Sequence, residues 1–391
     1  MRTAILGLGR EGKSLLNFLK KRGEKPAILD QKLDSEYLNR LNDFDIIYRS
    51  PGVPYNLPQI QKALKSGVRF SSATKLFFDL CPGQIVGVTG TKGKGTASTL
   101  IHKILAASGQ KTFLAGNIGK PMLDVLSKLD KKSTAILELS SFQLQDLEKS
   151  PPVAVVLDVF PDHLDVHKNM KEYVEAKSSV TKYQKFSDAV FFFKDNPLSA
   201  KIARLSHGAK IGIDGNPFGL KKNLAIAAAV GAYFDCPAGK IFQTIQSFKG
   251  REHRLELVSE KNGLRFYNDS ASTNPQTAAA AITELSKTLY SKSHTLTLIT
   301  GGKDKNLNYR PLAQAINRSG KVKVFLFGEN KMKIKRVLPK AKLCKNLKET
   351  VGLAKKCGPG VILFSPASTS FDMFKDYEDR GRQFKKLVKA I

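Results

Sequence analysis

The sequence predicts an α/β protein of three domains, in which strands alternate with helices and pair mostly in parallel. Short apolar runs recur along the chain, and most of them are followed by a helical pattern. The chain has 391 residues, more than one hydrophobic core usually supports. Hydrophobic residues make up 41% and charged residues 25% of it, as in globular proteins and unlike disordered ones.

The order of the predicted elements suggests where the domains meet. Residues 12–22 are amphipathic, with Leu15, Leu16 and Leu19 on one face, and further helices are expected at 96–107 and 224–233. We place boundaries near residue 73 and near Gly250, which gives domains 1–73, 74–250 and 251–391. The expected strands lie at 2–8, 26–29, 45–50, 85–90, 134–139, 153–159, 189–193, 296–300, 323–328 and 361–365, and a strand pair follows Gly250.

Composition limits the setting and the partners. No apolar stretch is long enough to span a bilayer, no signal pattern opens the chain, and the four cysteines lack zinc-site or disulfide spacing. We therefore expect a cytoplasmic protein without a membrane span. The formal charge is +30, but the lysines are spread along the chain and no nucleic-acid motif occurs. Anionic small-molecule substrates are favoured over a basic nucleic-acid-binding protein.

The segment GTKGKGT connects an apolar strand to a helix, the context in which phosphate-binding loops form. Its glycines let backbone N–H groups curl around phosphate oxygens, while Lys94 can reach the β and γ phosphates and Thr96 can help hold magnesium. The run is shorter than the general G-x-x-x-x-G-K-[ST] pattern. The alternative without a function is a glycine-rich turn with a solvated lysine. We expect ATP to bind to Gly90, Thr91, Lys92, Gly93, Lys94, Gly95 and Thr96.

A second glycine pattern follows the first strand. Gly7, Gly9 and Gly12 form G-x-G-x-x-G, and Asp30 ends the next strand. This pattern is typical of dinucleotide-binding turns, so a nicotinamide-dependent oxidoreductase is one alternative. Alone, it predicts only a nucleotide or pyrophosphate at a helix N-terminus.

Ten segments, in order through nearly the whole chain, resemble the Mur ligases. They are GLGREGKS, SPGVP, GVTGTKGKGT, GNIGKP, LELSSFQL, PDHLDVH with EYVEAK, GREHRLE, NDSASTNP, ITGGKDKN and SPASTSFDMFKDYEDRG. The resemblance implies a Rossmann-like domain that binds UDP, a central ATPase domain, and a Rossmann-like C-terminal domain that binds the incoming amino acid. Within the family, the match is to the type that adds D-glutamate to UDP-N-acetylmuramoyl-L-alanine in the synthesis of peptidoglycan precursors.

The resemblance also implies roles for individual residues. The catalytic set is Lys94, Glu138, His163 and Lys177. Two Mg²⁺ ions are expected on Thr96, Glu138, His163 and Lys177, the last as a carbamylated lysine. ATP would further contact Asn223, Arg254 and Asp269. The UDP substrate would contact Gly9, Arg10, Glu11, Asp30, Ser50, Gly52, Asn117 and His163, and D-glutamate would contact Thr273, Lys305, Ser370, Phe371 and Tyr377.

The implied reaction proceeds through an acyl phosphate. The carboxylate of the substrate takes the γ-phosphoryl group of ATP, and the amine of D-glutamate then displaces phosphate to form an amide. Domain closure is expected, because an acyl phosphate must be kept from water. We expect the enzyme to act as a monomer.

Five positions depart from the family pattern. Ala271 stands where lysine is usual, Lys222 replaces a histidine and Ile226 replaces an asparagine. Asp158 takes a position that is commonly asparagine, and Val166 one that is commonly arginine. We hypothesise that other lysines, such as Lys303, offset the cation missing at Ala271. The alternatives are a divergent or inactive relative and a folylpolyglutamate synthase-like ligase with another acceptor.

Overall fold

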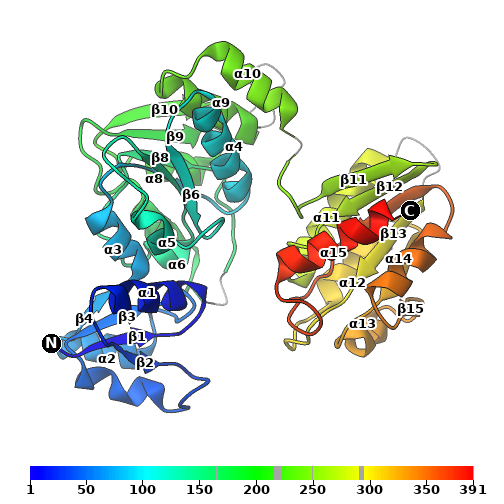
Figure 1. Ribbon diagram of the computed structural model, residues 1–391, viewed down its shortest axis with the longest axis horizontal. Coiled ribbons are helices and arrows are strands. Elements are labelled where there is room, and N and C mark those ends of the chain that lie inside the picture. The colour runs from blue at the N-terminus through cyan, green and yellow to red at the C-terminus, as the bar shows by residue number, and fades with distance from the viewer. Residues whose placement is uncertain (164–165, 215–221, 249, 290–294, 391) are drawn as a thin grey trace. The chain divides into compact units, whose positions relative to one another are not determined.

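The computed structural model describes residues 1–163, 166–214, 222–248, 250–289 and 295–390, so Leu164 and Asp165 of the PDHLDVH segment lie outside it. The chain forms two compact units, Met1–Phe248 and Lys249–Ile391 (Figure 1). The first unit contains two sheets and the second contains one. The predicted α/β class with mostly parallel sheets is confirmed.

The first sheet carries the G-x-G-x-x-G turn. Its strands are all parallel and lie in the order β2 (Ala27–Leu29), β1 (Thr3–Leu6), β3 (Ile46–Arg49) and β4 (Arg69–Ser71). The turn after β1 leads directly into α1, which packs Leu15 and Leu19 into the core. The helical segments of this part are α1 (Arg10–Lys21), the 3-10 segment η1 (Tyr37–Asp43), α2 (Pro58–Lys65) and α3 (Ala73–Leu80).

The second sheet carries the phosphate loop near its middle, between β5 and α4. Its strands are parallel and lie in the order β10 (Ala209–Ile213), β9 (Ala189–Phe193), β8 (Val153–Val156), β5 (Gln84–Thr89), β7 (Thr134–Glu138) and β6 (Thr112–Gly116). The helices of this part are α4 (Lys94–Ala107), α5 (Met122–Leu126), α6 (Ser141–Leu144), α7 (Met170–Ser178), α8 (Pro197–Ala203), α9 (Lys222–Tyr233) and α10 (Ala238–Ser247).

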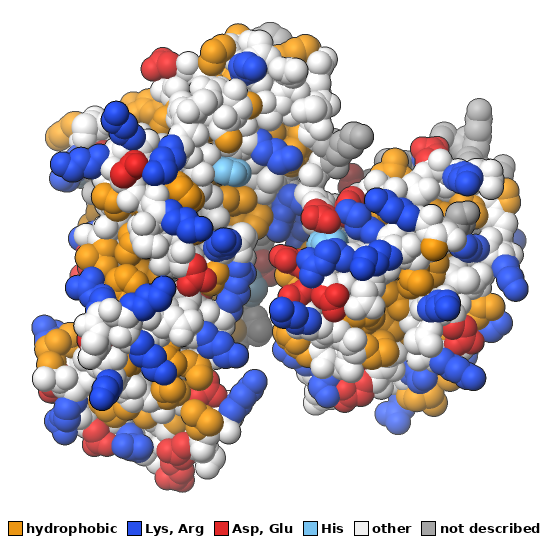
Figure 2. Space-filling model, viewed as in Figure 1, with side chains coloured by type: hydrophobic (Ala, Val, Ile, Leu, Met, Phe, Trp, Pro, Cys, Tyr) orange, Lys and Arg blue, Asp and Glu red, His pale blue; other side chains and the backbone are white. Residues whose placement is uncertain are grey.

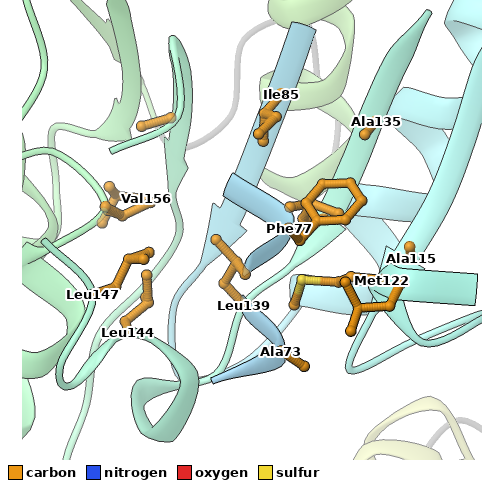
Figure 3. Close-up of a cluster of buried hydrophobic side chains, with 14 of the residues drawn as sticks. Ala73, Phe77, Ile85, Ala115, Met122, Ala135, Leu139, Leu144, Leu147 and Val156 are labelled. Atoms are coloured by element: carbon orange, nitrogen blue, oxygen red, sulfur yellow. The ribbon is translucent and has the colours of Figure 1, made fainter. Parts of the chain in front are cut away.

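Both faces of this second sheet are buried, which is why its strands read as continuous apolar runs. Successive side chains of β5 point to opposite faces, so Ile85 enters one hydrophobic cluster while Val86 enters the other. The cluster around Ile85 also takes Phe77 from α3 and Met122 from α5 (Figure 3). This cluster includes Ile5 of the first sheet, so one core joins both sheets of the first unit.

The second unit is built on a sheet of six strands. Its order is β11 (Glu256–Lys261), β12 (Leu264–Asn268), β16 (Gly360–Phe364), β13 (Thr295–Thr300), β14 (Val322–Leu326) and β15 (Lys342–Leu343), and only the β11–β12 pair is antiparallel. The helices are α11 (Pro275–Leu289), α12 (Arg310–Arg318), α13 (Lys331–Val337), α14 (Leu347–Lys355) and α15 (Tyr377–Lys389). No helix among the described residues is long and apolar enough to cross a bilayer.

Polar contacts complete the junction between the first two sheets. Arg49 of β3 is buried and donates to Asp146 at 2.9 Å and to the carbonyl oxygen of Phe142. Lys75 of α3 lies 3.3 Å from the other oxygen of Asp146. Gln143 donates to Glu11 at 2.5 Å. A buried charge pair at a junction holds one relative placement strongly, because separating the partners would leave an uncompensated buried charge.

Breaking this pair from one side will destabilise the first unit. We expect Arg49→Met to lower the free energy of unfolding by about 3 kcal/mol, because Asp146 would then be buried with Lys75 as its remaining ionic partner. An Arg49→Met/Asp146→Leu double variant should recover most of the loss. Urea unfolding followed by circular dichroism measures both. The control is Lys111→Met in the exposed Lys111–Asp130 pair, and an equal loss there would contradict the assignment.

Candidate active site

The phosphate loop runs from the end of β5 to the start of α4. Gly90 and Gly93 have φ angles of +146° and +84°, which side chains other than glycine rarely adopt. Lys94 begins the helix, and its Nζ donates to the carbonyl oxygens of Gly90 and Thr91 at 3.0 and 3.1 Å. Thr96 lies in the first turn of α4, and Lys92 is exposed. The loop therefore combines a helix N-terminus with a lysine folded over it, as anion binding requires.

A second constraint keeps Gly93 free of a side chain. A Cβ atom on Gly93 would lie 2.6 Å from both terminal atoms of the Asn223 amide. Asn223 is in the first turn of α9, so the start of that helix rests directly on the loop. Asn223 therefore contacts the loop to which ATP is predicted to bind.

Lys177 reaches the same loop from α7. Its side chain is only 1% exposed, and its Nζ donates to the carbonyl oxygen of Gly90 at 3.0 Å. Burial, together with repulsion from Lys94, lowers the pKa of Lys177 well below its ordinary value. The ammonium lies 4.5 Å from the ring centre of Tyr173. Burial also raises the pKa of Tyr173 to about 12, and its hydroxyl lies 3.0 Å from that of Thr91.

Glu138 ends β7 and supplies a buried carboxylate beside the loop strand. One of its oxygens accepts from the Asn117 amide at 3.1 Å. The other, Oε2, has no hydrogen-bond partner among the described residues. Because a buried carboxylate oxygen is rarely left unpartnered, Oε2 points to a group not present in the protein itself.

The two histidines of the PDHLDVH segment differ in their surroundings. His163 has a φ of +55°, is half exposed, and packs edge-on against Phe142 at 5.0 Å between ring centres. His167 is buried and stacks on the Phe142 ring at 5.2 Å between ring centres, and its Nε2 lies 3.0 Å from the Ser141 hydroxyl. His167 therefore anchors the segment that presents His163.

The G-x-G-x-x-G turn is held in a similarly tight arrangement. A Cβ atom on Gly12 would lie 2.2 Å from the carbonyl oxygen of Gly7, which requires glycine there. The Ser50 hydroxyl donates to the same Gly7 oxygen at 2.5 Å. Asp30 accepts from the backbone N–H of Leu8 at 2.6 Å, and this bond and that from Lys32 lower its pKa. Arg10 donates to the carbonyl oxygen of Gly119 and so ties the turn to the GNIGKP segment.

Two neighbouring cavities in the first unit collect most of the predicted residues. The first, of about 530 Å³, is lined by Gly9, Arg10, Glu11, Asp30, Ser50, Gly52 and Asn117 among others. The second, of about 490 Å³, is lined by Lys94, His163 and Lys177 together with Ser140, Ser141, Phe142, Val166 and Tyr173. Both share a wall formed by Glu11, Pro51, Gly52, Pro54 and Asn117. The nucleotide turn and the phosphate loop thus open onto adjoining spaces.

The other predicted residues lie in the second unit. Lys305 has its Nζ 6.0 Å from the ring centre of the exposed Phe371. Ser370 is buried, and the backbone of Lys303 bonds to Thr369, which joins the GGKDK segment to the SPASTSF segment. The hydroxyl of Ser270 donates to the carbonyl oxygen of Tyr377 at 2.8 Å. Thr273 is half-buried just beyond Ser270 in the NDSAST segment.

Asp269 is engaged by the protein itself. It is 2% exposed and accepts from the hydroxyls of Ser272 and Ser365 at 2.5 and 2.7 Å and from the backbone of Leu255. Burial raises the pKa of its carboxyl, while these hydrogen bonds and the charge of exposed Arg254 act to lower it. The geometry shows Asp269 ordering the strand ends around it.

One of the sequence departures, and the lysine expected to offset another, have a visible structural setting. Ile226 is fully buried in the hydrophobic core between α9 and the second sheet, where an amide would need a partner. Lys303 forms an ion pair with Glu329 at 2.6 Å, so its charge is already partly compensated. The second cavity is also lined by four residues that were not predicted, although LELSSFQL and EYVEAK contain them: Ser140, Ser141, Phe142 and Tyr173.

Two family models match this chain. The model of the Mur ligase middle domain matches residues 88–263, and that of the Mur ligase glutamate ligase domain matches residues 253–367. The UDP-N-acetylmuramoylalanine–D-glutamate ligase of Acetivibrio thermocellus is 34% identical over 100% of this chain and 96% of the relative. The enzyme of the same name from Symbiobacterium thermophilum is 33% identical over 100% and 98%.

The chain belongs to the Mur ligase family. Solved structures share the fold of this Mur ligase. UDP-N-acetylmuramate-alanine ligase MurC from Thermotoga maritima matches with a TM-score of 0.60 at 15% identity, covering 100% of this chain and 99% of that one. E. coli FolC in complex with ADP also matches with a TM-score of 0.60 at 15% identity, covering 81% and 93%. At this identity the likeness concerns the fold alone.

Nucleotide binding by this Mur ligase should depend on the bare backbone of Gly93. We expect Gly93→Ala to weaken ATP binding at least about tenfold, because the methyl group meets Asn223 and the φ angle disfavours alanine. Gly109→Ala is the matched control, since Gly109 also has a φ of +84° but has nothing within 4 Å of the added Cβ. Isothermal titration calorimetry measures both, and an equal loss in the two variants would contradict the role of Asn223.

The buried Lys177 should reduce the stability of this Mur ligase. We expect Lys177→Met to raise the free energy of unfolding by about 1–3 kcal/mol, because an apolar side chain replaces a desolvated amine. The native pKa lies below the unfolded value, so wild-type stability rises with pH between the two. The gain in the variant should therefore shrink as pH rises. Urea unfolding in buffer depleted of carbon dioxide tests this, with exposed Lys182→Met as the control. Lower stability of Lys177→Met would refute it.

Proposed function

We propose that this Mur ligase adds D-glutamate to UDP-N-acetylmuramoyl-L-alanine and hydrolyses ATP in doing so. The observation that carries the proposal is the shared wall of the two cavities, formed by Glu11, Pro51, Gly52, Pro54 and Asn117. A long substrate can occupy the first cavity with its nucleotide and extend its carboxylate into the second, toward Lys94. Full-length relatives that carry the corresponding name support the same substrate.

In this proposal the nucleotide end is held by the G-x-G-x-x-G turn. The N-terminus of α1 offers backbone N–H groups and a positive potential to the diphosphate. Arg10 and Ser50 border the same space, and Asp30 holds the turn in shape through Leu8. Asn117 lies where the two cavities meet, so we assign it to the part of the substrate between the diphosphate and the carboxylate.

The proposed chemistry has two steps. An oxygen of the substrate carboxylate attacks the γ-phosphorus of ATP, the bond to the β-phosphate oxygen breaks, and ADP leaves. The amine of D-glutamate then attacks the acyl carbon, loses a proton, and displaces inorganic phosphate, which leaves an amide. Lys94 and the N-terminus of α4 stabilise negative charge on the transferring group, and the walls of the second cavity orient the carboxylate.

The residues beside the loop fit the magnesium ions that such a reaction uses. Glu138 Oε2 is a buried carboxylate oxygen without a hydrogen-bond partner among the described residues, and carboxylate oxygen is what Mg²⁺ prefers. Thr96 could supply a hydroxyl, and we assign His163 to the second ion. Burial lowers the pKa of the Lys177 amine, which favours the neutral form that combines with carbon dioxide to give a carbamate. When bound, the ions supply charge stabilisation for the transferring phosphoryl group.

For the amino acid, we assign Thr273, Lys305, Ser370, Phe371 and Tyr377 of the second unit. A lysine with hydroxyl and backbone donors suits a dicarboxylate, and Lys305 is exposed beside Phe371. Arg254 and Asp269 remain our proposed contacts to ATP, with Asp269 acting through the backbone that it orders. We further propose a cytoplasmic monomer, because each proposed contact can be supplied by one chain.

A folylpolyglutamate-type ligase is the second candidate, because FolC shares the fold. The first cavity argues for a nucleotide substrate, since Asp30 and Ser50 both brace the G-x-G-x-x-G turn that lines it. A direct comparison of acceptors separates the two reactions.

Phosphate release from ATP should require UDP-N-acetylmuramoyl-L-alanine and D-glutamate together. A coupled phosphate assay with a panel of D- and L-amino acids measures this, and mass spectrometry of the product identifies the amide. Lys94→Ala should lower kcat/KM at least about a hundredfold, because a cation is lost from the transferring group. Release that depends on a folate and L-glutamate, or on no acceptor at all, would refute the proposed substrates.

A further inference from the structure

An ion-pair cluster lies beside the phosphate loop and has no role in the chemistry above. Lys222, the first residue of α9, donates to Asp158 at 3.2 Å and to Asp195 at 2.7 Å. Its ammonium also lies 5.0 Å from the ring centre of Phe193. The side chains of Lys222 and Asp158 are 29% and 22% exposed, so this is not an ordinary surface pair. We call Lys222, Asp158 and Asp195 the α9 clamp.

The phosphate loop is contacted near both of its ends, by Asp158 of the α9 clamp and by Asn223, which follows Lys222. The backbone N–H of Thr91 donates to the carbonyl oxygen of Asp158 at 2.8 Å. On the other side, Asn223 follows Lys222 directly and rests its amide on Gly93. Lys222 therefore bonds the segment that supports the start of the loop to the helix that supports its end.

Charge gives the clamp a second effect. Asp158 places a carboxylate next to a loop that would hold a polyanion, and an unpaired carboxylate there would repel phosphate. Burial acts against the charged lysine, but the hydrogen bonds that Lys222 donates to Asp195 and Asp158 raise its pKa, so it stays a cation. The charge of Lys222 compensates the Asp158 carboxylate. The asparagine that is common at position 158 in the family would need no such compensation. The two departures from the family pattern, at 158 and 222, are thus paired in space.

We propose that Lys222 is a positioning residue for ATP: it neutralises Asp158 and holds Asn223 against Gly93, and so sets nucleotide affinity without touching the reacting atoms. The inference rests on the proposed function only in taking ATP as the nucleotide of the loop. It does not depend on the identity of the acceptor or of the amino acid.

The first test is direct binding of ATP with Mg²⁺ to the full-length protein, with no other substrate present. We expect Lys222→Met to raise the Kd for ATP about tenfold, because Asp158 is left uncompensated and α9 loses its anchor. In turnover, KM for ATP should rise by a similar factor while kcat changes less than about twofold. An unchanged Kd in Lys222→Met overturns the inference.

The matched control is Lys194→Met. Lys194 follows β9 and pairs with Asp214 at 3.2 Å, but both side chains are exposed and neither contacts the loop in the described structure. We expect its Kd for ATP to stay within about twofold of wild type, as for exposed ion pairs generally. An equal loss of affinity in Lys194→Met would show that any lost lysine charge lowers ATP affinity, and would overturn the role of the clamp.

Rescue separates positioning from a general structural role. Asp158→Asn should restore about threefold of the tenfold loss of ATP affinity in the Lys222→Met background, because the carboxylate that needed compensation is gone while the anchor of α9 stays lost. Asp158→Asn alone keeps Lys222 paired with Asp195, and it provides the measurement if Lys222→Met does not fold. The Kd of the Asp158→Asn single variant for ATP should stay within about threefold of the wild-type value. A double variant as weak as Lys222→Met, or a tenfold loss in Asp158→Asn alone, overturns the inference.

Two further outcomes distinguish a failure of the proposed function from a failure of the clamp. If wild type binds ATP but forms no amide with D-glutamate, the proposed function fails while the affinity comparison still tests the clamp. If Asp158→Asn changes the magnesium requirement at fixed ATP, Asp158 is a metal contact and the clamp assignment is overturned.

Discussion

Two lysine side chains converge on the carbonyl oxygen of Gly90, and much of the site depends on this arrangement. Lys94 and Lys177 each place Nζ at 3.0 Å from that oxygen. One lysine starts the helix that follows the loop, and the other comes from α7, so the loop is fixed from two sides. Concentrated positive charge is unfavourable in the empty protein and favourable once a triphosphate arrives, which makes the loop a preorganised anion site. Burial and repulsion from Lys94 lower the pKa of Lys177, which reflects the same crowding of positive charge.

The junction inside the first unit extends this arrangement toward the nucleotide turn. Arg49 is buried against Asp146, and the residue that follows it, Ser50, bonds to Gly7 of the G-x-G-x-x-G turn. The same segment continues into Pro51 and Gly52, which line both cavities. Shifting the first sheet against the second would therefore break a buried ion pair and also separate the two cavities. Their alignment is a consequence of packing between the sheets.

Local patterns in the sequence were sufficient to predict the loop and most strands, because glycines between an apolar strand and a helix have few other uses. Four of the described strands were not predicted, since they lie at sheet edges and are only partly apolar: β4, β6, β10 and β15. Long-range pairs were beyond sequence reasoning. Nothing local indicates that Arg49 meets Asp146, or that His167 braces His163 through Phe142. The domain boundaries and the roles assigned to individual site residues remain predictions.

The net charge of +30 does not by itself explain how the loop attracts phosphate. Lys and Arg side chains are scattered over both units on the face shown in Figure 2. Exposed charges of this kind are screened within about 10 Å at moderate salt. The lysines that matter are defined by their surroundings: Lys94 folded over the loop, Lys177 buried, and Lys222 held by two carboxylates. Each environment gives its lysine different contacts, so position rather than number determines what a lysine contributes here.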